Sequence, residues 1–235
     1  MDENLDHYSV ISTKIEKGAR VDRDTLVKRY RPNINLPISL TDLKSLMDNY
    51  TTDLVQSGVP MPEVIESNIL DDHLSYEVVN AGQNLIQMGM SHKNFRNFIP
   101  QINEIFCVLV KAIDKSIMID PHPKNFVFFG KDIFYVDFYP PYSKLYNEIR
   151  ISIAHKSERE IVEKNLSYFS SPYIAPHFCG DFINISKQFT SIFRTIFDIS
   201  KEQDLFDGKF VEFTELAVEI RATEDERIAR GIYLV

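Results

Sequence analysis

The chain has 235 residues, a formal net charge of −8 and a sequence pI near 5.3. Its acidic balance argues against a duplex nucleic-acid binder, because such proteins take much of their affinity from Lys and Arg side chains that neutralise phosphates. Hydrophobic residues make up 44% of the sequence and aromatic residues 12%, which is typical of a packed globular protein and excludes a disordered chain.

The first predicted elements are two strands and a helix. Residues 8–12 and 25–30 are rich in β-branched and aromatic side chains, and a polar turn near Gly18 separates them. A helix is predicted next, over residues 40–57, because apolar side chains recur at helical spacing on one face: Leu43, Leu46, Met47, Tyr50 and Leu54. A segment without helix or strand pattern follows this predicted helix.

The break is the segment from Gly58 to Pro62, where glycine and proline force an extended turn. Apolar residues then alternate around Val64–Ile65 and again from Leu74 to Val79, which predicts two further strands. The segment from Asn80 to Gly82 is a polar link. We therefore place a boundary between two lobes near residue 80.

Beyond this link the pattern becomes mainly helical. Apolar residues from Ile102 to Ile113 hold one helical face, and later helices are predicted around residues 189–197 and 213–220. Two short apolar strands, 126–129 and 133–136, flank a three-residue turn that contains Gly130 and predict a hairpin. The fold class expected from these elements is α+β.

The residues that can carry chemistry stand at the two ends of this hairpin. The string Asp120-Pro-His-Pro-Lys-Asn125 comes immediately before it, and Asp137 comes immediately after it. One tight turn should therefore bring two carboxylates and an amide together. Mg²⁺ prefers oxygen ligands, and a further carboxylate can accept or orient the proton of an attacking hydroxyl.

The pattern D-x-H-P-x-N, followed by a hydrophobic hairpin and then Asp, resembles the catalytic loop of aminoglycoside phosphotransferases and the wider choline-kinase-like group. It also resembles the atypical kinases of ubiquinone biosynthesis. The resemblance implies a kinase-like fold, with a small β-rich N-lobe over residues 1–80 and a mainly helical C-lobe over residues 81–235. It assigns Asp120 as the catalytic base, and Asn125 and Asp137 as ligands of Mg²⁺ beside ATP.

The resemblance extends upstream to the predicted strands and helix. It implies that Lys28 contacts the phosphates of ATP and pairs with an acid on the helix, with Asp48 the first candidate and Asp53 the second. Glu77 to Asn80, including Val79, would form the hinge that meets the adenine through backbone groups. The sequence departs from the family pattern at Met118, where a histidine is usual, and it has no glycine-rich loop before Lys28.

The function that the resemblance implies is ATP- and Mg²⁺-dependent phosphoryl transfer to a hydroxyl of a small-molecule acceptor. One alternative is a kinase-fold pseudoenzyme that binds a nucleotide or regulates a partner, and another is a protein kinase. Asp120 and Asn125 could also be ordinary turn residues, and Lys28 an ordinary exposed lysine of a strand.

The remaining expectations concern compartment and membranes. Cys107 and Cys179 have no C-x-x-C spacing, which favours a reduced, cytoplasmic protein. The first six residues are polar and acidic, without an apolar leader region, and no apolar run reaches the length that spans a bilayer. We therefore expect no association with a membrane.

Overall fold

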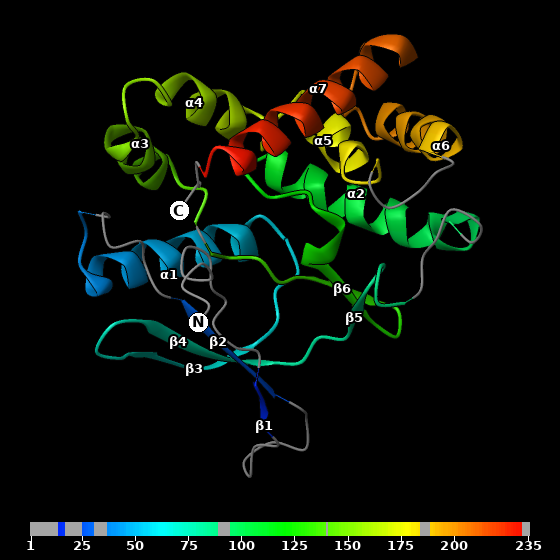
Figure 1. Cartoon of the computed structure of the whole chain (residues 1–235). Coiled ribbons are helices and arrows are strands. Elements are labelled where there is room, and N and C mark those ends of the chain that lie inside the picture. Colours follow the sequence, from blue (N-terminus) through cyan, green and yellow to red (C-terminus); the bar gives the residue numbers. More distant parts are fainter. Residues whose placement is uncertain are drawn as a thin grey trace, which may run out of the picture.

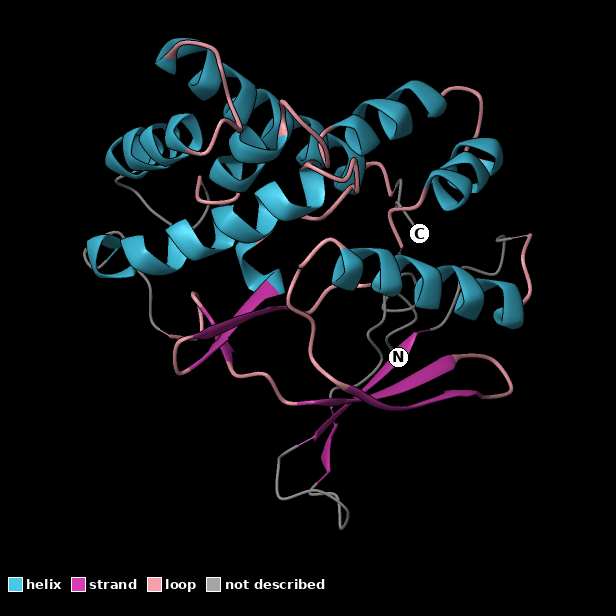
Figure 2. Cartoon of the chain, turned by 180° about the vertical axis from the view of Figure 1, so that it is seen from behind, coloured by secondary structure: helices cyan, strands magenta, loops and turns pink. Residues whose placement is uncertain are grey.

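The structure is a computed structural model that describes residues 14–16, 25–30, 37–88, 95–139, 141–183 and 189–231. It is an α+β protein, as the sequence predicts. Its strands gather on one side and helices fill the other, with α1 lying between the larger sheet and the other helices (Figures 1 and 2). The predicted strand over residues 8–12 lies outside the described residues.

The larger sheet is built from four antiparallel strands in the order β1-β2-β4-β3. Their bounds are Lys14–Glu16 for β1, Thr25–Tyr30 for β2, Val64–Ile69 for β3 and Leu74–Val79 for β4. In β4, Leu74, Tyr76 and Val78 are buried and the residues between them are half-buried. This alternation turns one face of the sheet toward α1 and the core.

Helix α1 spans Leu40–Gln56 and joins β2 to β3. Ser39 caps it, because the Ser39 hydroxyl accepts a hydrogen bond of 3.1 Å from the backbone N–H of Asp42. The helix buries the face predicted from the sequence, through Leu43, Met47, Tyr50 and Leu54. It ends before Gly58, which has a φ of 87°, a conformation that glycine adopts without strain.

A second sheet connects the two parts of the chain. It contains β5 (Gln83–Asn84), β6 (Phe126–Phe129) and β7 (Asp132–Tyr135) in the order β5-β6-β7. Strands β6 and β7 form the predicted hairpin. Gly82 lies against this hairpin with a φ of +108°, and a Cβ atom at its position would lie 2.0 Å from the carbonyl oxygen of Phe128. Only glycine fits there.

The helical part follows β5. Its helices are the 3₁₀ turn η1 (Phe95–Phe98), α2 (Ile99–Ile113), the 3₁₀ turn η2 (Pro123–Asn125), α3 (Lys144–Ile153), α4 (Arg159–Ser167), α5 (Ile174–Gly180), α6 (Phe189–Glu202) and α7 (Phe210–Ala229). Helix α5 packs against both α6 and α7. Within the described ranges, no helix combines the length and the apolar character that crossing a membrane requires.

One continuous hydrophobic core joins the sheet to the helices. Phe138, just after the hairpin, packs edge-on against Tyr30 of β2 and Tyr76 of β4, with ring centroids 5.7 Å and 5.4 Å away. The larger sheet ends at Val79, next to the predicted boundary near residue 80, and hydrophobic packing continues across this point.

Candidate functional site

The loop from Asp120 to Asn125 is a compact turn held by its own polar groups. The carboxylate of Asp120 accepts a hydrogen bond of 2.9 Å from the backbone N–H of His122. The ring Nδ1 of His122 accepts one of 3.2 Å from the N–H of Lys124, and the His122 carbonyl accepts one of 2.9 Å from the N–H of Asn125. His122 therefore braces this loop.

The two ends of the hairpin meet at Asn125 and Asp137. The backbone N–H of Val136 donates to the carbonyl of Asn125 at 2.8 Å. The side-chain amide of Asn125, only 4% exposed, donates to Asp137 Oδ2 at 3.1 Å. The expected convergence of these side chains is therefore present.

The electrostatics of Asp137 suit a cation. Burial and the neighbouring carboxylate of Asp120, with which Asp137 shares a hydrogen bond, raise the pKa of Asp137 to about 7, against the opposing charge of Lys28. A divalent cation bound to Asp137 would favour the ionised form of its carboxylate. The carboxylate of Asp137 and the amide oxygen of Asn125 fit the oxygen ligands that Mg²⁺ prefers.

Lys28 enters the same site from β2. Its ammonium group donates to the backbone carbonyl of Val136 and lies 5.1 Å from the centroid of the Phe138 ring. Burial lowers the pKa of Lys28 to about 8, while the negative charge of Asp137 raises it. Lys28 therefore links the larger sheet to the residue before Asp137.

Asp48 does not pair with Lys28, which corrects the prediction from the sequence. Its carboxylate lies 2.6 Å from the ammonium nitrogen of Lys44, one helical turn earlier, and accepts a hydrogen bond of 3.1 Å from the hydroxyl of Tyr76. Tyr76 stands directly opposite Lys28 in the register of β2 and β4. The hydroxyl of Tyr76 is thus the partner of Asp48. The carboxylate whose charge raises the pKa of Lys28 is that of Asp137.

Asp53, the second candidate for a partner of Lys28, is exposed near the end of α1. It lines a surface hollow with Gln56 of the same helix and Lys115, which follows α2. Within the described residues, neither Asp48 nor Asp53 is thus a partner of Lys28.

Glu77 and Val79 lie inside β4, paired with Val27 and Thr25 of β2. The N–H of Val79 donates to the carbonyl of Glu63 at 2.9 Å, so the sheet already uses it. The chain leaves the sheet only at Asn80, whose side-chain oxygen accepts from the N–H of Gly82 at 3.2 Å. The N–H of Val79 is therefore not free for the backbone contact predicted for the hinge.

The hydrogen bonds that hold Asp120 and Met118 in place were not predicted from the sequence. The hydroxyl of Tyr135 accepts a hydrogen bond of 3.2 Å from the N–H of Asp120. Met118, which departs from the family pattern, is held at its carbonyl by the hydroxyl of Tyr50 at 2.9 Å and at its sulfur by the amide of Asn147 at 3.3 Å. An aromatic residue in a strand or on an apolar helix face carries no signal that separates this role from packing.

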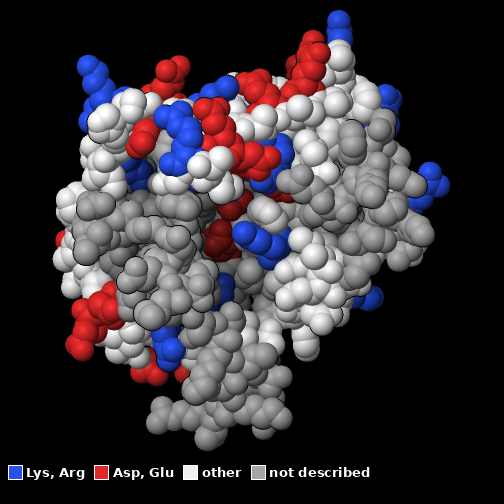
Figure 3. All heavy atoms as spheres, viewed as in Figure 1, with Lys and Arg blue, Asp and Glu red and all other residues white. Residues whose placement is uncertain are grey.

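On the face shown in Figure 3, acidic and basic side chains gather around a hollow near the middle of the molecule. The sequence matches no protein-family model, and comparison with curated proteins finds no relative.

Proposed function

We propose that this chain is a kinase-like phosphotransferase that uses ATP and Mg²⁺ to phosphorylate a hydroxyl of a small molecule. The observation that carries the proposal is the convergence of four side chains on one hairpin. Asn125 donates to Asp137, Asp137 lies beside Asp120, and Lys28 donates to the residue preceding Asp137. A base, two metal ligands and a phosphate-binding cation are the groups that phosphoryl transfer needs.

The order of elements supports a two-lobed, kinase-like arrangement. Two described strands, a helix and two further strands form the β-rich part, and the loop, the hairpin and the helices follow it. The loop and hairpin lie where the two parts meet, because Phe138 packs on both Tyr30 and Tyr76. A nucleotide between the lobes would lie beside Lys28 and the segment 80–82.

Each side chain has a distinct role in this proposal. Asn125 and Asp137 would hold Mg²⁺, which neutralises charge on the phosphates when bound. Lys28 would contact the same phosphates as a point charge. Asp120 would take the proton of the acceptor hydroxyl while the acceptor oxygen bonds to the γ-phosphorus and the bond from that phosphorus to the β-phosphate oxygen breaks.

The direct test is a single-turnover assay with γ-labelled ATP, Mg²⁺ and a panel of small alcohols. We expect label to move to at least one acceptor, and the Asp120→Asn variant to move it about 10²–10⁴-fold more slowly. If the Asp120→Asn variant kept hydrolysis or transfer at the wild-type rate, the role of Asp120 as the base would be contradicted.

A second candidate is a pseudokinase that binds ATP without transferring phosphate. Two observations favour it: Met118 replaces the usual histidine, and the ammonium of Lys28 is bound to a backbone carbonyl rather than to an acid on α1. The single-turnover assay separates the two candidates, because a pseudokinase would bind ATP and leave the label in it.

A further inference from the structure

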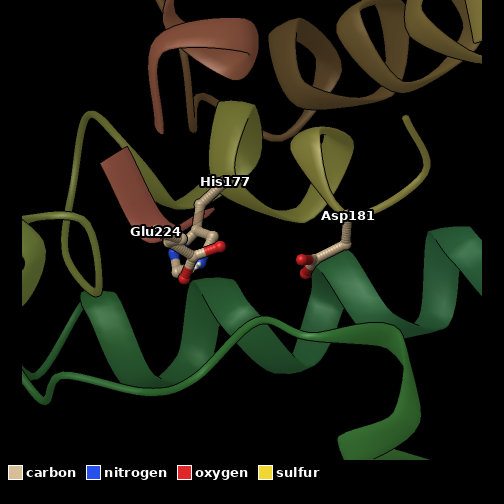
Figure 4. Close-up of side chains that lie close together, drawn as sticks. All are labelled: His177, Asp181 and Glu224. Carbon is tan, nitrogen blue, oxygen red and sulfur yellow. Dashed lines mark hydrogen bonds and ion pairs between the residues drawn. The ribbon is translucent and has the colours of Figure 1, made fainter. Parts of the chain in front are cut away.

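A second cluster of polar side chains lies inside the helical part, beside the loop that begins at Asp120, because His122 Nε2 of that loop is 3.8 Å from Asp181 Oδ1. His177 lies on α5, Asp181 at the C-terminal end of that helix and Glu224 on α7, which packs against α5 (Figure 4). His177 and Asp181 are four residues apart, so they project from one helical face. One ligand atom from each of the three residues lies within 4.8 Å of the other two.

The ring of His177 is fixed by hydrogen bonds on both sides. Its Nδ1 lies 3.1 Å from the carbonyl oxygen of Tyr168, and its Nε2 lies 3.0 Å from Glu224 Oε1. A carbonyl oxygen only accepts, so Nδ1 carries a proton and donates it to Tyr168. In histidines that bind metals, one ring nitrogen commonly donates to a backbone carbonyl and the other binds the ion. In this structure that other nitrogen, Nε2, is hydrogen-bonded to Glu224.

Asp181 is buried without the hydrogen bonds that a buried carboxylate normally makes. Its side chain is 1% exposed, and its Oδ2 has no hydrogen-bond partner among the described residues. Its Oδ1 lies 3.5 Å from Arg221 Nη1 and 3.8 Å from His122 Nε2, which is longer than a good hydrogen bond. Figure 4 shows this carboxylate directed toward His177 and Glu224.

We propose that His177, Asp181 and Glu224 form a binding site for a divalent transition-metal ion, with Zn²⁺ and Mn²⁺ as the ions to test. One imidazole nitrogen and two carboxylates suit these ions better than Mg²⁺, which prefers oxygen ligands alone and keeps several waters. A buried site with ligands from two packed helices would serve to tie α5 to α7.

Two positive groups, the guanidinium of Arg221 and the protonated ring of His177, compete with the ion for these carboxylates. Arg221 Nη1 lies 3.5 Å from Asp181 Oδ1 and 3.6 Å from Glu224 Oε2, and its Nε donates to exposed Asp225 at 3.1 Å. Glu224 also favours the proton on Nε2 of His177. Binding of a divalent ion therefore releases that proton, and Arg221 remains paired with Asp225.

The test uses protein freed of metal with a chelator and then dialysed. We expect calorimetric titration with Zn²⁺ or Mn²⁺ to show a site that depends on His177 and Glu224, besides any binding at the proposed Mg²⁺ site, and to raise the melting temperature. His177→Ala and Glu224→Gln should each weaken binding by about tenfold or more, as loss of a ligand or its support does. Glu224→Gln keeps the shape of the side chain and the hydrogen-bonding capacity, which protects the fold.

Two controls make the result specific. His73→Ala removes a surface histidine whose Nδ1 lies 2.7 Å from Asp72, and it should leave the titration unchanged. Asp137→Asn should leave the site that depends on His177 unchanged, which separates this site from the proposed Mg²⁺ site. No binding at about 100 μM Zn²⁺ or Mn²⁺, or equal affinity in the wild type, His177→Ala and Glu224→Gln, would overturn the proposal.

Discussion

Asp120 and Asp137 share one site but have different surroundings. One oxygen of Asp120 closes the loop by accepting from the N–H of His122, so the interpretation of Asp120 as a turn residue also holds. Asp137 is bonded by Asn125 and lies beside Lys28, which favours a ligand of a cation over a base. The two carboxylates should therefore respond differently to substitution.

The paired substitutions Asp120→Asn and Asp137→Asn test this difference. Asp120→Asn should lower phosphoryl transfer by about 10²–10⁴-fold and leave the affinity for Mg²⁺-ATP nearly unchanged, because a base acts in the transition state. Asp137→Asn should weaken the Mg²⁺-dependent part of ATP binding. Calorimetry and a transfer assay measure both, and an equal loss of ATP affinity in the two variants would argue against the roles assigned.

Lys28→Met should lower the affinity for ATP by about tenfold or more, because a hydrogen bond to a charged group contributes about 1.5–3 kcal/mol. Binding of adenosine, which has no phosphates, should be unaffected. Lys44→Met is the matched control, since Lys44 pairs with Asp48 and not with the site. Equal losses for ATP and adenosine in Lys28→Met would make Lys28 a structural residue.

At the scale of elements, the hairpin and the segment before β5 hold the site together. Gly82 packs against the backbone of β6, and β5 pairs with that strand through Gln83 and Asn84. The carbonyl of Pro60 also accepts from the N–H of Tyr135 at 2.8 Å. The hairpin is thus fixed to both parts of the chain.

Gly82→Ala should destabilise the fold by about 2–4 kcal/mol, because it combines a positive φ with a Cβ atom that overlaps the backbone of Phe128. Gly130→Ala is the control, since Gly130 has a φ of +64° but no atom within 4 Å of an added Cβ. It should cost only about 1–2 kcal/mol. Urea unfolding of both variants measures the difference, and similar losses would contradict the close packing described at Gly82.

Most elements and the centre of the site could be predicted from the sequence. The helix predicted over residues 40–57 is α1, and the two ends of the predicted hairpin do meet at Asn125 and Asp137. The partner of Lys28 and the pairing of Val79 could not be predicted. Spacing along α1 shows which residues share a face, but it does not show that the Tyr76 hydroxyl donates a hydrogen bond to Asp48. The sequence also does not show that β4 pairs with β2 as far as Val79.

At the scale of the whole molecule, the sheet and the helices share one hydrophobic core. Tyr30, Tyr76 and Phe138 form the aromatic contact between them, with ring centroids between 5.4 Å and 5.8 Å apart. A chain of this size often unfolds in steps, but a continuous core couples its parts.

We therefore expect the chain to unfold in one cooperative transition. Far-UV circular dichroism follows the helices, and tyrosine fluorescence follows tertiary packing throughout the chain, which has 11 Tyr and no Trp. The two probes should give the same midpoint in urea. Separate midpoints would show that helices and tertiary packing are lost in separate steps.

The central claim is that the ends of one hairpin hold a magnesium nucleotide, and calorimetric titration of ATP with and without Mg²⁺ tests it most directly. The account predicts binding that Mg²⁺ strengthens in the wild type and a much smaller effect of Mg²⁺ in the Asp137→Asn variant. ATP at one hundred times its dissociation constant should also stabilise the wild type by about 2.7 kcal/mol. No binding of any nucleoside triphosphate at millimolar concentration, or binding that ignores Mg²⁺, would contradict it.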